Sequence, residues 1–222
     1  DAILVLCRTD AQEGAKRARG LSLVLTPRRQ PAVTVRRLEL MGMGAACTCE
    51  VFFDNAKASA DAVVGQQGRG WYHLLASLDE ERILCAAMYV GITSAALDQT
   101  LQYAKDRRAF GRSIGAFQAV QHPLAEIATE LEQIRLLTAK AAWLQSNGRE
   151  CATEAAMAKL AATETALRAT DRCMRVLAGY GLVEESPLER LFRDCRLGPF
   201  SPISNEMVMN FIGERMGLPR SY

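Results

Sequence analysis

Short apolar runs in residues 1–65 predict β-strands. Runs at 2–7, 21–25 and 32–38 are rich in Val, Leu and Ile. The run 47–53 alternates Cys, Cys, Val and Phe with other residues, as a half-buried strand does. About four strands are too few to close a barrel or a sandwich, so this region predicts part of a larger β-domain. The polar sequences TDAQEGAKRARG (9–20) and TPRRQP (26–31) predict the loops between the first three strands.

From Trp71 onward the pattern changes to that of long helices. A proline-free stretch predicts a helix over 71–106, FGRSIG (110–115) ends it, and a second helix is expected over 117–145. In the second helix, apolar residues recur every three or four positions, which is typical of a helix packed in a bundle. They are Phe117, Val120, Leu124, Ile127, Leu131, Ile134, Ala141 and Leu144.

Three further helices are expected. An Ala-rich helix follows SNGRE (146–150) and ends near residue 178. Ser186, Pro187 and Glu189 form a capping-box pattern that starts a short fourth helix. The last helix runs over about 204–216.

The predicted fold class is therefore mainly α with a partial β region. Residues 1–65 are expected to be the C-terminal part of an incomplete antiparallel β-domain. Residues 66–222 are expected to form an antiparallel helical bundle, because long helices joined by short loops pack in that way.

Composition excludes several classes of function. The formal net charge of +2 is too small to indicate a nucleic-acid or anionic-membrane surface, and no apolar run has the length of a membrane span. Seven cysteines without a CxxC pair, and only two histidines, give no zinc-ligand spacing, so no metal site is predicted. The cysteines are best interpreted as reduced thiols of a cytoplasmic protein.

The sequence DAILVLCR begins within a predicted strand. A strand this apolar needs neighbours. We expect this chain to be part of a longer polypeptide, or to pair with a separate chain that supplies an N-terminal half.

One acid falls within an apolar stripe of the first long helix. Leu74, Leu78, Cys85, Met88 and Ile92 follow a three-and-four spacing, and Glu81 occupies the position between Leu78 and Cys85. We therefore expect Glu81, rather than its neighbours Asp79 and Glu80, to be shielded from water. A shielded carboxylate holds a proton more readily, which suits a general base. By this pattern alone, a structural ion pair with an arginine of another helix is favoured over catalysis.

Three stretches resemble the acyl-CoA dehydrogenase family. MGMGAACTCEVFFDNAKASADAVVGQQGRGW (41–71) is similar to the end of the β-domain and the entry to the helical domain. LDEERILCAAMYVGITSAALDQTLQYAKDRRAFGRSIGAFQAVQHPLAE (78–126) is similar to the next two helices, and AGYGLVEESPLERLFRDCR (178–196) to a C-terminal block. The resemblance implies FAD-dependent α,β-dehydrogenation of an acyl thioester, in which a carboxylate removes the α-proton and the β-hydrogen leaves as hydride to the flavin.

The resemblance also implies which residues contact FAD. Arg107 and Phe110 of DRRAFG match residues that touch the FAD of a neighbouring subunit, and Gln118 matches a residue at the same cofactor. An arginine there can hold a pyrophosphate with two hydrogen bonds.

A second group matches a turn against the adenosine part of FAD. Ala178 and Gly179 are small enough for close backbone approach, although a glycine here is also expected at a plain helix C-cap. Arg175 stands where the family usually has glutamine. Arg193 and Asp194 fit the C-terminal block and are interpreted as a structural ion pair.

The chain departs from most of the family at the catalytic base. Alignment from Arg193 puts Pro202 where most members carry their glutamate. The isovaleryl- and long-chain-type branch instead has a Glu-Arg pair on the first long helix, which here is Glu81 and Arg82. The resemblance thus assigns Glu81 as the base and Arg82 as a substrate-binding residue.

The implied partners are an acyl-CoA or acyl-carrier-protein thioester, an electron-transfer-flavoprotein-like acceptor, and further copies of the chain in a homodimer or homotetramer. Two alternatives remain open. The chain could be a non-catalytic or degenerate subunit that completes a partner's FAD site, or it could be a flavin oxidase or monooxygenase on the same fold.

Overall fold

The chain folds as two compact units, which are described separately. A computed structural model describes residues 1–10 and 18–220; the predicted loop 9–20 therefore lies partly outside the described residues. The first unit comprises residues 1–40 and 44–78, and the second comprises residues 41–43 and 79–222. The predicted domain division between residues 65 and 66 stays a prediction.

The first unit is built from two small antiparallel sheets. One has the order β1 (Ala2–Arg8), β2 (Leu21–Pro27), β5 (Val63–Val64), and the other pairs β3 (Val33–Arg37) with β4 (Cys49–Phe53). The register of β1 with β2 runs from Ala2 opposite Pro27 to Arg8 opposite Leu21. The four predicted strands are confirmed.

The predicted half-buried alternation of the fourth strand is wrong in this chain. Cys47 lies outside β4 with a positive φ of 49°, and Phe52 and Phe53 on opposite faces are both exposed, by 55% and 41%. The reason is that, within the described residues, no second layer buries either face of the two-stranded sheet of β3 and β4.

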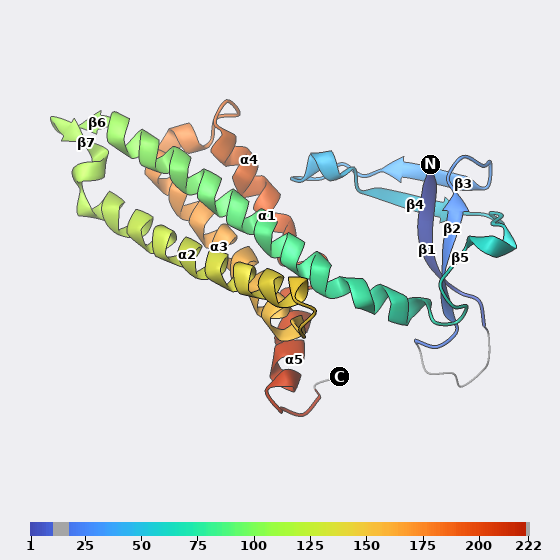
Figure 1. Cartoon of the computed structure of the whole chain (residues 1–222). Helices are drawn as coiled ribbons and strands as arrows, with labels where there is room; N and C mark the ends of the chain where they lie inside the picture. Colours follow the sequence, from blue (N-terminus) through green and yellow to red (C-terminus); the bar gives the residue numbers. More distant parts are fainter. Residues whose placement is uncertain (11–17, 221–222) are drawn as a thin grey trace. The chain divides into compact units, whose positions relative to one another are not determined.

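The second unit is an antiparallel helical bundle, as predicted. The three long helices are α1 (Gly70–Asp106), α2 (Gln118–Ser146) and α3 (Ala152–Leu177). Successive helices run in opposite directions (Figure 1). A hairpin of β6 (Arg108–Ala109) and β7 (Arg112–Ser113) joins α1 to α2. The short α4 (Pro187–Asp194) and α5 (Asn205–Arg215) complete the bundle.

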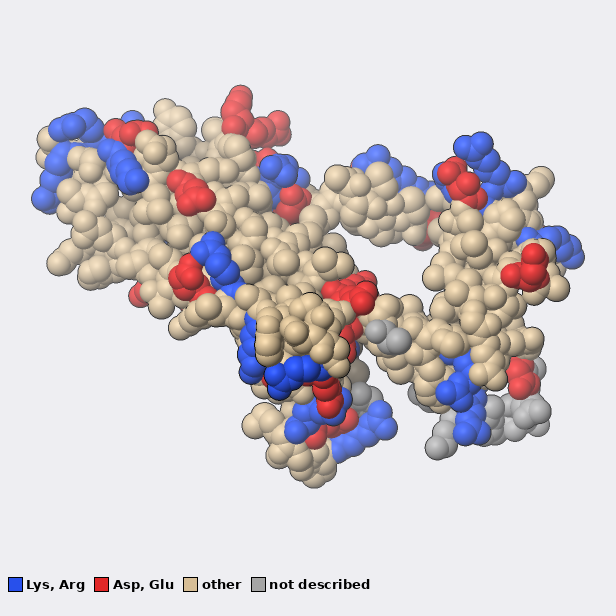
Figure 2. All heavy atoms as spheres, in the orientation of Figure 1, with Lys and Arg blue, Asp and Glu red and all other residues tan. Residues whose placement is uncertain are grey.

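The core consists of apolar stripes on α2 and α4, of both large and small apolar residues on α1, and of mostly small residues on α3. The predicted stripe of α2 is buried from Leu124 to Leu144. The buried face of α3 is mostly alanine and threonine, which lets neighbouring helices approach closely. Five buried threonine hydroxyls donate to the carbonyl four residues earlier in their own helix: Thr93, Thr100, Thr138, Thr163 and Thr170. Acidic and basic side chains are mixed over the outer face (Figure 2).

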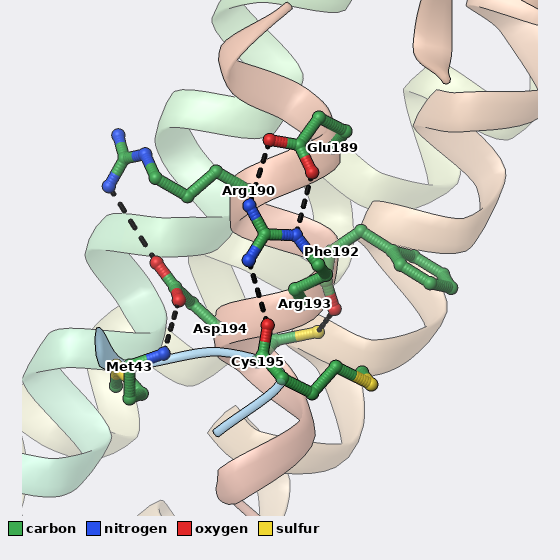
Figure 3. Close-up of polar contacts among 8 residues, drawn as sticks. Met43, Glu189, Arg190, Phe192, Arg193, Asp194 and Cys195 are labelled. Atoms are coloured by element: carbon green, nitrogen blue, oxygen red, sulfur yellow. Dashed lines mark hydrogen bonds and ion pairs between the residues drawn. The ribbon is translucent and has the colours of Figure 1, made fainter. Parts of the chain in front are cut away.

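Residues 41–43 are tied to α4 by charged side chains. The Arg193 guanidinium donates to both oxygens of Glu189, at 2.7 and 2.9 Å, and to the Met41 carbonyl at 2.7 Å. The Asp194 carboxylate accepts a hydrogen bond from the Met43 amide at 2.5 Å (Figure 3).

These contacts correct two sequence predictions. Arg193 and Asp194 do not pair with each other, because adjacent residues on a helix point in different directions, whereas Glu189 and Arg193 are four apart on one face. The second oxygen of Asp194 faces Arg190, 3.6 Å away. The capping box is absent: Ser186 makes no side-chain cap, and the Glu189 carboxylate is occupied by Arg193.

Candidate functional site

A hollow of about 240 Å³ lies between α1 and the segment that connects α4 to α5. From α1 it is lined by Glu81, Leu84, Cys85, Met88 and Tyr89. From the connecting segment it is lined by Leu197, Ser201 and Pro202. Glu81 is the one carboxylate among these described lining residues.

Glu81 is exposed in this chain, so the expectation that it is shielded from water is wrong. Two stripes on α1 share the same three-and-four spacing. The buried one contains Arg82, Ala86, Tyr89, Thr93, Ala96 and Thr100 rather than the leucines and methionine used for the prediction. This stripe faces the core of the bundle, which leaves Glu81 and Met88 exposed on the other side of α1, whereas Ile92 of the predicted stripe is buried.

Arg82 faces the interior of the bundle and does not line the hollow. Its guanidinium donates to Asp79 at 2.8 Å and lies 5.3 Å from the ring centre of Phe211, and the residue is 8% exposed. The structure thus does not bring Arg82 together with Glu81, and this placement gives no support to a substrate-binding role. Adjacent helix positions diverge, which is the physical reason.

Cys85 is a lining residue that the sequence analysis used only as a member of the stripe. It lies one helical turn after Glu81, and its Sγ contacts the Ser201 carbonyl at 3.6 Å. Burial raises the pKa of the Cys85 thiol to about 11; the nearby Lys159 charge opposes the shift and the Glu81 charge adds to it. Cys85 is therefore a neutral thiol at physiological pH.

A second candidate region lies at the far end of the bundle, around the hairpin. Arg107 is exposed at the end of α1, Phe110 at the hairpin tip is 94% exposed, and Gln118 is exposed at the start of α2. The Phe110 ring lies edge-on to Phe117, with 6.1 Å between ring centres. Arg and Lys side chains gather on this end (Figure 2).

The end of α3 lies at the same end of the bundle. Tyr103, whose carbonyl accepts from the Arg107 amide, has its ring 6.1 Å from that of Tyr180 in the turn after α3. Ala178 and Gly179 are exposed in this turn, Ala178 with a positive φ of 51°. No atom lies within 4 Å of where a Gly179 side chain would begin. The turn therefore has open space on this side.

Arg175 is exposed and pairs with Asp171 at 2.9 Å. It also lines a hollow of about 260 Å³ beside Ala119 and Val120 at the start of α2. The six residues predicted at FAD thus come from three separate stretches that meet at one end of the bundle.

Comparison with known proteins identifies the family. The profile of the acyl-CoA dehydrogenase C-terminal domain matches residues 68–217. The short/branched chain specific acyl-CoA dehydrogenase of Rattus norvegicus is 35% identical over 97% of this chain and 50% of its own length. The chain belongs to the acyl-CoA dehydrogenase family.

Solved structures of the family agree with the fold. The acyl-CoA dehydrogenase from Geobacillus kaustophilus superposes with a TM-score of 0.95 at 36% identity, covering 98% of this chain and 57% of that one. The prolyl acyl carrier protein oxidase AnaB gives a TM-score of 0.88 at 27% identity, with coverage of 98% and 56%. The chain spans about half the length of these relatives.

The hairpin end of this chain presents residue types that are suited to FAD. The exposed arginines Arg107 and Arg175 are suited to phosphates, Phe110 offers an aromatic face, and the open space beside Gly179 admits close backbone approach. Within residues 1–10 and 18–220, no cluster of His, Cys, Asp and Glu could hold a metal ion. No helix in that part of the chain is long and apolar enough to cross a membrane.

Proposed function

We propose that this chain contributes the helical domain of an FAD-dependent acyl-thioester dehydrogenase in which Glu81 is the catalytic base. Residues 66–222 would form that domain and residues 1–65 the end of the preceding β-domain. Membership of the acyl-CoA dehydrogenase family supports the reaction class. The observation that carries the assignment of the base is that Glu81 and Pro202 line one hollow.

The chemistry of the hollow favours Glu81 over any residue of the 199–206 segment. Pro202 occupies the usual position of the base but has no proton acceptor on its side chain. Glu206 is exposed on the first turn of α5 and does not line the hollow. A carboxylate on the α1 wall can take the α-proton of a thioester seated against Pro202. FAD, when bound, supplies the hydride acceptor.

Arg107, Phe110, Gln118, Arg175, Ala178 and Gly179 would hold that FAD. Because Phe110 projects from the tip of the hairpin with 94% of its surface exposed, it is placed to reach a cofactor outside its own bundle. A homodimer or homotetramer in which the hairpin of one subunit reaches the FAD of another follows from this proposal. Light scattering of the FAD-loaded protein checks it, and a stable monomer at micromolar concentration would contradict it.

Glu81→Gln tests the base, because it keeps the shape of the side chain and removes the proton acceptor. We expect flavin reduction by an acyl thioester to slow at least about a hundredfold, the low end of general-base contributions. The bound FAD, read from its visible absorbance, should be unchanged. The substrate is chosen as the fastest of a panel from butyryl-CoA to palmitoyl-CoA, straight and branched.

Glu80→Gln is the matched control, since Glu80 is exposed on another face of α1 and does not line the hollow. It should reduce flavin at the normal rate. A normal rate in folded Glu81→Gln would show that the base is another residue. If wild type shows no reduction with any thioester of the panel, the non-catalytic alternative is favoured.

The proposal also includes the carrier of the acyl group and the electron acceptor. The substrate is an acyl-CoA or an acyl-carrier-protein thioester, and the acceptor resembles electron-transfer flavoprotein. The likeness to an acyl carrier protein oxidase supports the alternative that this protein is a flavin oxidase. Oxygen consumption during turnover separates an oxidase from a dehydrogenase. The seven free thiols support a cytoplasmic location.

A further inference from the structure

Lys159 is a fully buried lysine in the first half of α3. It is 0% exposed, and among the described residues no carboxylate forms an ion pair with it. Its Nζ donates to the Ile203 carbonyl at 2.7 Å and to Oδ1 of Asn205 at 2.6 Å. Burial lowers the pKa of Lys159, because the charged form loses hydration, and the Cys85, Glu164 and Glu206 groups only partly offset this. A buried ammonium costs stability unless its hydrogen bonds are well formed.

Asn205 extends this contact into a small polar network. It is 2% exposed at the first position of α5. Its Nδ2 donates to Glu164 at 2.7 Å and to the Thr163 hydroxyl at 3.1 Å. Its backbone amide donates to the Pro199 carbonyl at 2.8 Å, which closes the segment 199–205 into a loop. Lys159, Thr163 and Glu164 thus attach the end of this loop to α3, and the Asn205 amide ties the start of the loop to that end.

The same loop forms one wall of the hollow that contains Glu81. Ser201 and Pro202 lie between Pro199 and Asn205, whose hydrogen bond closes the loop, and they line the hollow. At the start of the loop, a Cβ on Gly198 would lie 2.8 Å from the Tyr89 ring and 2.9 Å from Thr163, so the chain passes there without spare room. The loop is therefore held at its base by close packing and at its end by Lys159.

We infer that Lys159 is a positioning residue that fixes the 199–205 loop, and with it Pro202, as the wall of the hollow facing Glu81. It acts through the backbone of Ile203 and the side chain of Asn205 and does not itself line the hollow. The catalytic consequence rests on the proposed function, but the positioning of the loop does not.

Lys159→Met tests the positioning directly, because it keeps the unbranched shape and most of the length of the side chain and removes the donor. Hydrogen exchange of the Asn205 and Val208 amides is measured by NMR or mass spectrometry. We expect exchange at least about tenfold faster, since two charge-assisted hydrogen bonds are lost. Lys140→Met is the matched control, because Lys140 is exposed on α2 and pairs with Glu154 at 3.2 Å. It should leave these amides unchanged.

A second variant keeps the test decisive if Lys159→Met does not fold. Asn205→Ala removes one of the two acceptors of Lys159, together with the Nδ2 donor to Glu164 and Thr163, and leaves the Ile203 carbonyl in place. We expect its loop amides to exchange about threefold faster. Wild-type exchange of the loop in the folded variants would overturn the inference.

A kinetic measurement separates positioning from simple loss of stability. In the FAD-loaded protein, folded Lys159→Met should lower the limiting rate of flavin reduction at least about tenfold per bound flavin. The half-saturating thioester concentration should change much less. A purely structural role would lower the melting temperature and leave the limiting rate unchanged. Failure of the base assignment appears only in Glu81→Gln, so the two outcomes are distinguishable.

Discussion

Gly42 lies where residues 41–43 cross α4, and there is no room there for a side chain. A Cβ at this position would lie 2.6 Å from the Arg193 carbonyl carbon and 2.8 Å from the Asp194 amide nitrogen, with the Arg193 carbonyl oxygen closer still. Carbon atoms in contact normally lie about 3.5–4.0 Å apart. Because the obstructing atoms belong to the backbone of α4, Gly42→Ala must move residues 41–43 away from the helix.

The size of the effect follows from the contacts that would be lost. Moving the segment breaks the Arg193–Met41 and Asp194–Met43 hydrogen bonds, of 2.7 and 2.5 Å. A hydrogen bond to a charged group contributes about 1.5–3 kcal/mol, and this magnitude applies to the Asp194–Met43 bond alone, because the Arg193 guanidinium faces solvent. The variant should therefore lose up to about 3 kcal/mol of local stability. This value is also an upper limit, because once the segment is detached the clash is relieved.

Hydrogen exchange of the Met43 amide measures this local free energy. Since about 1.4 kcal/mol corresponds to a factor of ten, exchange should become up to about a hundredfold faster in Gly42→Ala. Gly44→Ala is the control, two residues along the same segment, because a Cβ at Gly44 meets no atom within 4 Å. It should exchange at the wild-type rate. Unchanged Met43 protection in Gly42→Ala, or equal effects of both variants, would refute the reasoning.

Two further predictions concern the core and the thiols. Ile127→Ala, at a fully buried position of α2, should lower the free energy of unfolding, measured in urea, by about 2–5 kcal/mol. Thr129→Ala, on the exposed face of the same helix, should change it by under about 0.5 kcal/mol. Similar effects of the two variants would contradict the assigned core. Because burial raises the pKa of Cys85 to about 11, its alkylation by iodoacetamide should rise about tenfold per pH unit between about pH 8 and pH 10, and exposed Cys47 should react first at about pH 8. Peptide mass spectrometry follows both sites, and a rate that levels off below about pH 9 would count against the shift.

The bundle was predictable from sequence because apolar residues recur along one side of a long helix. On α2, apolar residues from Leu124 to Leu144 fall on a single stripe, and that stripe is buried. On α1, two stripes have equal spacing. Hydrophobicity favoured the one that contains Leu78 and Met88, whereas the folded bundle buries the one that contains Ala86 and Thr93. The exposure of Glu81 could not be predicted from the helix alone, because it depends on which neighbour the helix packs against.

The Lys159 network was missed for a different reason. A lysine is expected on a surface, and the only sequence signal was its position between Ala155 and Ala162, on the alanine-rich face of α3. Its partner Asn205 is 46 residues away. No local pattern joins the two, so the contact becomes visible only once α5 and the loop before it are folded against α3.

The buried threonines affect how the sequences of the three long helices can vary during evolution. The hydroxyl protons of Thr93, Thr100 and Thr138 are directed to carbonyls of their own helices, so their methyl groups are left to face the neighbouring helix. The hydroxyls of Thr163 and Thr170 also contact Asn205 and Cys195, outside α3. Contacts between the helices then depend on shape, and alanine, valine or serine could substitute at many of these positions without finding a new polar partner. The contact surfaces between the long helices therefore tolerate substitution. The residues that form the hydrogen bonds between α3 and the 199–205 loop, in contrast, must change together. Among relatives, variation is therefore expected to be free along the helix seams and correlated at the loop.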